Sequence, residues 1–411
     1  MTEWNKIIGP GILFAATAIG VSHLVQSTTA GALFGLSMIG FVALANILKF
    51  PFFEYGSRYA AATGTSIIEG YYKLNKVWLY VYLLITFVSM FFVTAAVGAV
   101  TIGFMENLFG INEMIGFQKT THFLLFFGCT ALLMFGRFNL MEKLIKILGI
   151  VLLLTTIISF VAALFKGPAS TSGLFPPLGD VGWAFLLPLM GWMPTAIDLS
   201  AWNSLWTVEK IKQTGYKPSV KESVKEFSFG YWISATLAFF FLIMGALLVY
   251  NSGIIVPEGG VAFSGFVIAL YTESIGQWAA YIVSIAAFSI MFSTFLTILD
   301  GYSRAITTSF KILSPTINKK NFLEKIILII VSAGGLILIL LFENNTAGFR
   351  MLVNTATTIS FIVAPVIAVL NFRLVMSDKI GKENAPNKFM KILSWLGIFY
   401  LIAFLIWFLI T

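Results

Sequence analysis

Two long apolar segments of the sequence are each interrupted near the middle by glycine, proline and polar residues. Asp198 follows the second interruption, and a carboxylate at that depth can coordinate a cation, exchange a proton or hold an ammonium group. His23 follows the first, and an imidazole can bind a transition metal or relay protons. The residues that we expect to contact a solute surround the two interruptions: Gly20, Ser22, His23, Gln26, Met190, Met193, Thr195 and Asp198.

A structural role is the alternative for each of these side chains. A buried aspartate can tie two helices together, and a buried histidine can donate to a carbonyl that a helix break has freed. Small hydroxyl side chains hold membrane helices together. Methionine fills helical cores as well as offering a thioether to soft metals. The single cysteine, Cys129, fits a small apolar position and excludes an intramolecular disulfide.

Two further pairs of opposite charges are spaced four residues apart, Glu54 with Arg58 and Asp300 with Arg304. On a helix this spacing places both charges on one face. Both pairs lie toward the expected cytoplasmic ends of their segments, which favours a structural ion pair or an inner gate over a solute site. Lys49 lies near the middle of its segment, where its long stem can snorkel or its ammonium can pair with Glu54.

The elements that position these residues are membrane-spanning helices. Hydrophobic residues make up 58% of the chain and charged residues only 11%, whereas soluble domains carry about 25% charged residues. A spanning helix needs about 20 mainly apolar residues, and eleven segments qualify. They are roughly 7–35, 37–63, 77–107, 120–136, 142–166, 181–207, 226–251, 276–308, 324–342, 349–375 and 391–410.

The positive charges predict the orientation of these spans. Of the 26 Lys and Arg residues, 22 fall on one side of the predicted spans, three (Lys119, Lys166 and Arg350) fall on the other, and Lys49 lies within a span. Cytoplasmic loops carry the Lys and Arg excess. We therefore expect a multi-pass protein of a cell inner (plasma) membrane with a cytoplasmic N-terminus and no cleaved signal peptide. The net charge of +8 follows from this topology, so the expected partner is the lipid bilayer and not nucleic acid.

The interruptions fall in the first and sixth spans, five spans apart. Gly- or Pro-interrupted spans at matching positions indicate an inverted-repeat transporter with its site at the two breaks. The sequence thus predicts an all-α integral membrane protein with a single transmembrane domain over 1–411. Its first repeat covers about 7–166, its inverted repeat about 181–375, and an extra helix about 391–410.

The first two spans carry a series of short motifs: Gly9-Pro10-Gly11, Ala30-Gly31, Phe34-Gly35, Ala45-Asn46, Ala62-Thr63-Gly64 and Glu69. With these motifs the segment of about 9–70 resembles, without gaps, the Nramp family of divalent metal transporters. Met193-Pro194 in the sixth span is similar to that family's Met-Pro-His motif.

The resemblance implies a leucine-transporter-type fold, alternating access and import of a divalent metal with protons. It also implies metal ligands at Met193 and at the Met190 carbonyl. The family's Asp-Pro-Gly-Asn metal motif aligns with Gly20-Val21-Ser22-His23, which lacks the carboxylate, and its histidine after Pro194 is Thr195 here. Its acidic residues on the third span have no counterpart in 77–105, which speaks against proton coupling of the family type.

These departures leave more than one function open. A divalent cation in a membrane needs charge compensation, which Asp198 can supply in a relocated metal site of Asp198, Met193 and His23. A hydrated ion such as Mg²⁺ needs fewer protein ligands. The alternative is an ion-coupled transporter of a small organic solute such as an amino acid on the same fold, with a channel or receptor as a third class. The sequence contains no nucleotide-binding, nucleophile or hydrolase motif, so neither an enzyme nor a bound cofactor is expected.

Overall fold

The computed structural model describes residues 7–135, 138–170, 173–314, 322–343 and 347–410. Over these ranges the secondary structure is helical, without a strand. One to three helices cover each of the eleven predicted spans, which confirms the predicted fold class. These helices are α2 Pro10–Ala18, η1 Ser22–Ser27, α3 Thr28–Phe34, α4 Ile39–Thr63, α6 Lys76–Phe109, α8 Thr120–Phe135, α9 Phe138–Lys166, α10 Gly179–Gly191, α11 Leu199–Thr214, α12 Val220–Leu248, α14 Ala280–Leu313, α15 Phe322–Phe342, α16 Gly348–Val375 and α17 Lys388–Ile410.

Short helices occupy the connections between the spans. Helix α13, Gly260–Ile275, lies in the long connection after the seventh span. The seventh span begins earlier than predicted, because Ser219 and Glu222 form a capping box that starts α12 at Val220. The other short elements are α5 Ile67–Leu74, α7 Ile111–Ile115, η2 Gln277–Ala279, η4 Asp378–Ile380 and η5 Lys382–Asn384.

Seven helices among the described residues are long and apolar enough to cross a membrane by themselves, or eight when the bent pair α2 and η1–α3 counts as one span. The remaining predicted spans are helical but unusual. The second, α4, carries three charged residues. The fourth, α8, has 16 residues, and the sixth is divided into α10 and α11.

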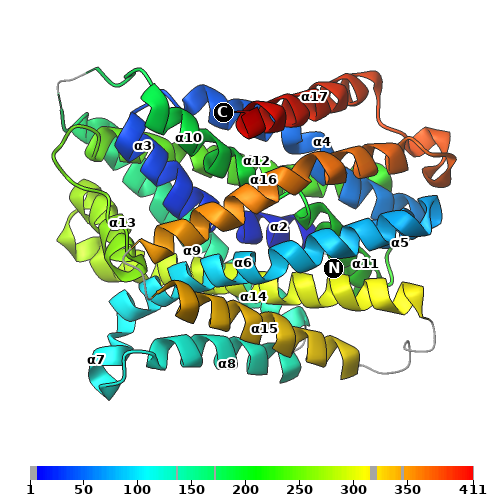
Figure 1. The fold of residues 1–411 in the computed structure, drawn as a ribbon, viewed down its shortest axis with the longest axis horizontal. Coiled ribbons are helices and arrows are strands. Elements are labelled where there is room, and N and C mark those ends of the chain that lie inside the picture. Colours follow the sequence, from blue (N-terminus) through cyan, green and yellow to red (C-terminus); the bar gives the residue numbers. More distant parts are fainter. Residues whose placement is uncertain (1–6, 136–137, 171–172, 315–321, 344–346, 411) are drawn as a thin grey trace.

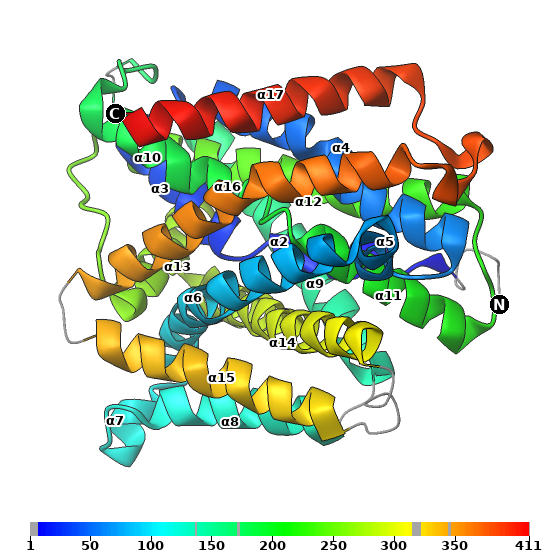
Figure 2. The ribbon, with the colours of Figure 1, turned by 45° about the vertical axis from the view of Figure 1, so that its right-hand side comes forward.

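The helices pack side by side as one bundle (Figure 1). The long helices α6 and α14 pack against each other; α15 contacts both of them, and α16 contacts α6. Helix α17 lies along one edge beside α4 and α16, and α8 lies along the opposite edge beside α15 (Figure 2). Helix α12 packs against α2, α3 and α4, so it supports both halves of the broken first span.

Glycines bring the first and seventh spans into backbone contact. A Cβ atom on Gly31 would lie 1.9 Å from the Leu242 carbonyl oxygen, and one on Gly245 would lie 2.4 Å from the Thr28 carbonyl oxygen. Small residues allow membrane helices to approach this closely. The Ala30-Gly31 motif therefore has a packing reason in this chain.

Both predicted breaks are present. The first span bends by 42° between α2 and η1, and it continues as a π-helix over Ser22–Ser27. The sixth span stops at Gly191 and resumes at Leu199, with a cis peptide bond between Met193 and Pro194. The two breaks face each other, since the Ser22 hydroxyl lies 3.0 Å from the Pro194 carbonyl oxygen. The division of the chain into two repeats stays a prediction from the sequence.

Candidate functional site

The break in the sixth span is filled by the ammonium group of Lys49, which comes from α4. Its Nζ donates to the carbonyl oxygens of Met190 (2.8 Å), Gly191 (3.1 Å), Met193 (3.0 Å) and Thr195 (3.4 Å). Lys49 is fully buried. The last carbonyls of a helix lack partners within that helix and carry its negative dipole end. The Lys49 ammonium therefore gives hydrogen bonds to the unpartnered carbonyls at the end of α10 and compensates the negative end of its dipole.

This position corrects the expectation that Lys49 snorkels or pairs with Glu54. The carboxylate of Glu54 binds Arg58 instead, with Nη2 2.5 Å from Oε1. The acid that interacts electrostatically with Lys49 is Asp198.

Asp198 lies at the start of α11 and is 3% exposed. Its Oδ1 has no hydrogen-bond partner among the described residues, and the buried Tyr82 hydroxyl is likewise without one. Both Tyr82 and Tyr302 lie within electrostatic reach of the Asp198 carboxylate. Asp198 thus lies in a buried region of polar aromatic side chains, with an oxygen left to bind a cation or a proton.

His23 uses both ring nitrogens within the protein. Nε2 lies 2.8 Å from the Ser234 carbonyl oxygen and Nδ1 lies 2.7 Å from the Ser22 hydroxyl. A carbonyl oxygen only accepts, so Nε2 carries a proton. The Ser22 hydroxyl also lies 2.7 Å from the Ala18 carbonyl oxygen. In this conformation neither nitrogen of His23 is free to bind a metal, and the residue links the first span to α12.

The three residues of the relocated metal site do not form a cluster in this conformation. Met193 is fully buried, and its sulfur lies 4.0 Å from the Ser27 hydroxyl. Neither Asp198 nor Met193 makes a hydrogen bond or ion pair with His23 within the described part of the chain. The same ranges hold no group of three His, Cys, Asp or Glu side chains placed to bind a metal.

A small cavity lies between the two breaks. Its volume is about 20 Å³, and Ser22 and Thr195 contribute its polar groups together with Thr17 and Thr294. Most of its other lining residues are apolar, among them Trp192. A cavity of this volume holds about one water molecule or a small ion. Gly20 lies beside it, because a Cβ atom there would lie 2.9 Å from the Thr294 methyl carbon.

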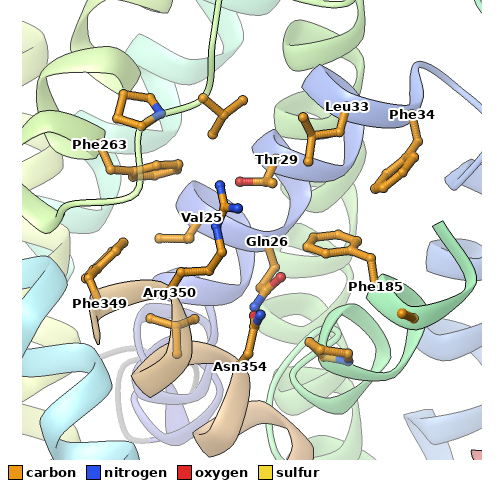
Figure 3. Close-up of a pocket in the computed structure, with 15 residues that line it drawn as sticks. Val25, Gln26, Thr29, Leu33, Phe34, Phe185, Phe263, Phe349, Arg350 and Asn354 are labelled. Carbon is orange, nitrogen blue, oxygen red and sulfur yellow. The ribbon is translucent and has the colours of Figure 1, made fainter. Parts of the chain in front are cut away.

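A larger cavity of about 240 Å³ lies between α3, α10, α16 and the connection before α13. Gln26, which lines it, is 1% exposed. Figure 3 shows the Gln26 and Asn354 side chains pointing toward each other inside this cavity. Arg350 also lines it and pairs with Glu258 of the connection, at 2.7 Å. The cavity therefore reaches from the rim at Arg350 to Gln26 beside the first break.

The two predicted ion pairs are formed, and each one ties helices together. Arg58 also donates to the Asn384 carbonyl oxygen at 2.7 Å, which joins α4 to η5. Arg304 Nε lies 2.8 Å from Asp300 Oδ1, and the Trp206 indole donates to Asp300 at 3.2 Å, which joins α14 to α11.

The lysine-rich face of the bundle is the one that holds Lys73, Lys217 and Lys379. Lys379 donates to the Lys73 carbonyl oxygen at 2.6 Å, and Lys217 donates to the Ala62 carbonyl oxygen at 3.1 Å, just before the end of α4. Helix α16, whose first turns carry Arg350 and Asn354 of the larger cavity, begins at the end of the bundle away from α5 (Figure 1).

Glu226 is a functional candidate that sequence reasoning missed. Its carboxylate accepts from the backbone N–H of Gly9 at 3.0 Å and of Gly11 at 2.9 Å, and it is 5% exposed. It therefore holds the start of α2, the first half of the broken span. Its place as the last charged residue before the long apolar part of α12 was the available signal.

Comparisons with known proteins agree with this architecture. The chain matches the family described as natural resistance-associated macrophage protein-like over residues 11–411. It is 31% identical to the uncharacterized protein PM0681 of Pasteurella multocida (strain Pm70) over 405 residues, which cover 97% of this chain and 90% of the relative.

Solved transporter structures share the fold. A mutant of the Eremococcus coleocola manganese transporter matches 98% of this chain and 85% of its own, with a TM-score of 0.70 and 14% identity. MhsT in complex with L-phenylalanine matches 97% of both chains, with a TM-score of 0.59 and 16% identity. The family match spans almost the whole chain and includes both broken helices, so this protein belongs to the Nramp family.

Proposed function

We propose that this protein is a secondary transporter that moves a divalent metal cation across a membrane by alternating access. Family membership over residues 11–411 supports transport, and a similar fold belongs to a manganese transporter. The positive charges of the sequence favour a cell inner membrane with a cytoplasmic N-terminus. On that orientation the lysine-rich face is cytoplasmic.

The observation that carries this proposal is that the two broken spans face each other across a small cavity. The Ser22 hydroxyl of the first break lies 3.0 Å from the Pro194 carbonyl oxygen of the second, and both Ser22 and Thr195 line the cavity. Met193, Ser22 and Thr195 then contact the metal from the two broken helices, and Asp198 compensates its charge.

The distribution of cavities and ion pairs supports alternating access. The larger cavity is lined by Arg350 and Asn354 near the start of α16, which lies at the end of the bundle away from α5 (Figure 1). The pair Glu54–Arg58 joins α4 to η5, and the pair Asp300–Arg304 joins α14 to α11. This is the arrangement of an outward-facing state, in which the solute enters past Arg350 and Gln26. Release requires the connections made by Arg58 and Asp300 to loosen.

A second candidate is transport of a small organic solute, and the larger cavity favours it. Its volume of about 240 Å³ far exceeds the needs of a bare ion. The Gln26 and Asn354 amides and the Arg350 guanidinium can bind a carboxylate. A similar fold binds L-phenylalanine in MhsT.

Uptake into proteoliposomes that contain a divalent-metal-sensitive dye tests the proposal. Mn²⁺, Mg²⁺ and Ca²⁺ are offered in turn to the wild type, to Asp198→Asn and to Asp378→Asn. The last variant makes the same change at an exposed position. We expect saturable influx in the wild type and in Asp378→Asn. In Asp198→Asn we expect the influx to fall at least about tenfold, which corresponds to a loss of about 1.4 kcal/mol in the binding free energy of the metal.

Metal influx that survives Asp198→Asn unchanged removes Asp198 from the site. No influx of any metal into vesicles that contain folded wild-type protein, together with saturable uptake of an amino acid, establishes the second candidate instead.

A further inference from the structure

We propose that the four carbonyl oxygens of Met190, Gly191, Met193 and Thr195, here called the carbonyl cradle, form a monovalent-cation site that this chain fills with its own Lys49 ammonium. The site is separate from the cargo and does not depend on its identity. A compact monovalent cation such as ammonium or K⁺ is the ligand class that the cradle takes when the lysine is removed.

The geometry of the cradle is that of a cation site. An ammonium group has three N–H donors, and here four carbonyl oxygens lie 2.8 to 3.4 Å from its nitrogen. Two of them close α10, where backbone carbonyls have no partner within the helix. Rings of backbone carbonyls replace the hydration shell of K⁺ in selective channels, so the same groups can hold a free ion.

The distances indicate a large monovalent ion over a divalent one. Oxygen ligands lie about 2.3–2.6 Å from Ca²⁺ and about 2.0–2.1 Å from Mg²⁺. The carbonyl oxygens of the cradle lie at 2.8 to 3.4 Å from the Lys49 nitrogen, and they belong to a segment held at both ends by α10 and α11. Contraction onto a small divalent ion would require the break to rearrange.

Because the carbonyl cradle and Asp198 are buried, a positive charge must lie between them to compensate the carboxylate and the carbonyl oxygens. Lys49 is completely buried, and its ammonium is the donor to all four carbonyl oxygens. Asp198 interacts electrostatically with this ammonium. Removing one member of a buried charged pair is strongly destabilising, because the partner stays buried and uncompensated. A chain without Lys49 therefore leaves a carboxylate and four carbonyls that favour a positive ion from solution.

Thermal unfolding of the purified protein in detergent tests this site without any transport measurement. The wild type, Lys49→Met and the control Lys73→Met are unfolded in choline chloride and then in increasing KCl or NH₄Cl at constant chloride. Lys73 is an exposed lysine, with 48% of its side chain accessible and Glu69 at 4.0 Å. Binding of radioactive rubidium is measured on the same samples.

We expect Lys49→Met to unfold at a lower temperature in choline and to regain stability saturably with K⁺ or ammonium. A cation at ten times its Kd raises the ratio of folded to unfolded protein about elevenfold. The wild type and Lys73→Met should not respond, and only Lys49→Met should bind rubidium.

An unfolding midpoint of Lys49→Met that is as insensitive to K⁺ and ammonium as that of the wild type overturns the proposal, as does an equal response in all three proteins. Should Lys49→Met fail to fold, Lys49→Gln replaces it, because its amide keeps two donors but no charge. Since the readout is stability, a negative result here leaves the transport proposal intact, and a failed uptake assay leaves this one intact.

Discussion

Replacement of Glu226 by alanine tests how the first broken span is anchored. The carboxylate lies across the start of α2 and accepts from two backbone N–H groups, those of Gly9 and Gly11, at 2.9 to 3.0 Å. The residue between them is proline, which has no N–H to offer. In Glu226→Ala these two N–H groups lose their acceptor in a buried place.

The size of the effect follows from these contacts. A hydrogen bond to a charged group contributes about 1.5–3 kcal/mol, and a negative charge at a helix N-terminus adds about 0.3–1 kcal/mol. Two such bonds and the charge predict a loss of about 3–7 kcal/mol in the free energy of unfolding. Glu226→Gln keeps one acceptor oxygen and loses the charge, so it should cost about half as much.

The assay is thermal unfolding of detergent-purified protein, followed by the fraction that stays monodisperse. One kcal/mol shifts the midpoint by about 2–4 °C in domains of moderate size, so we expect Glu226→Ala to fall by about 5 °C or more. Glu273→Ala is the matched control. Its carboxylate is 53% exposed and pairs with Lys166 at 2.8 Å, and an exposed pair contributes about 1 kcal/mol or less. Equal midpoints for the two variants would refute the anchoring role.

Two further predictions concern packing and pH. Gly31→Ala should destabilise the protein by about 1–3 kcal/mol through overpacking, because its Cβ atom would lie 1.9 Å from the Leu242 carbonyl oxygen. The control Gly40→Ala has no atom within 4 Å of its Cβ position and should not destabilise. Equal unfolding midpoints for the two variants would contradict the close contact of α3 and α12. Burial opposes ionisation of Glu343, but hydrogen bonds from His122 and Lys119 lower its pKa below the ordinary value. A carboxyl with a lowered folded-state pKa stabilises above its unfolded pKa of about 4.3 and loses that contribution as pH falls through the folded value. Glu343→Gln should therefore lower the unfolding midpoint at neutral pH and match the wild type in acid, and a difference that persists in acid would contradict this.

Much of the fold could be predicted because the signals are local. Runs of apolar residues mark the spans, and Gly20 and Pro194 mark the breaks where the structure has them. The pairs Glu54–Arg58 and Asp300–Arg304 were predictable because a helix brings residues four apart together wherever it lies.

The candidate site was harder to predict, because its contacts join residues that are far apart in the sequence. Lys49 binds carbonyls more than 140 residues away, and His23 binds the Ser234 carbonyl 211 residues away. The sequence shows that both are buried polar groups in need of partners. It does not show which backbone carbonyls the packing of α4 and α12 brings within their reach.

The sequence by itself determined the membrane-spanning class, the positions of the two breaks and the absence of the family's carboxylate on the first span. These properties depend on residue type and on helical spacing alone. Only the tertiary structure decided that Lys49 supplies the positive charge at the sixth-span break, that His23 is occupied by Ser22 and Ser234, and that Glu226 anchors α2. The reason is physical: a backbone carbonyl has no signature in the sequence, so the partner of a buried charge is known only once the helices are packed.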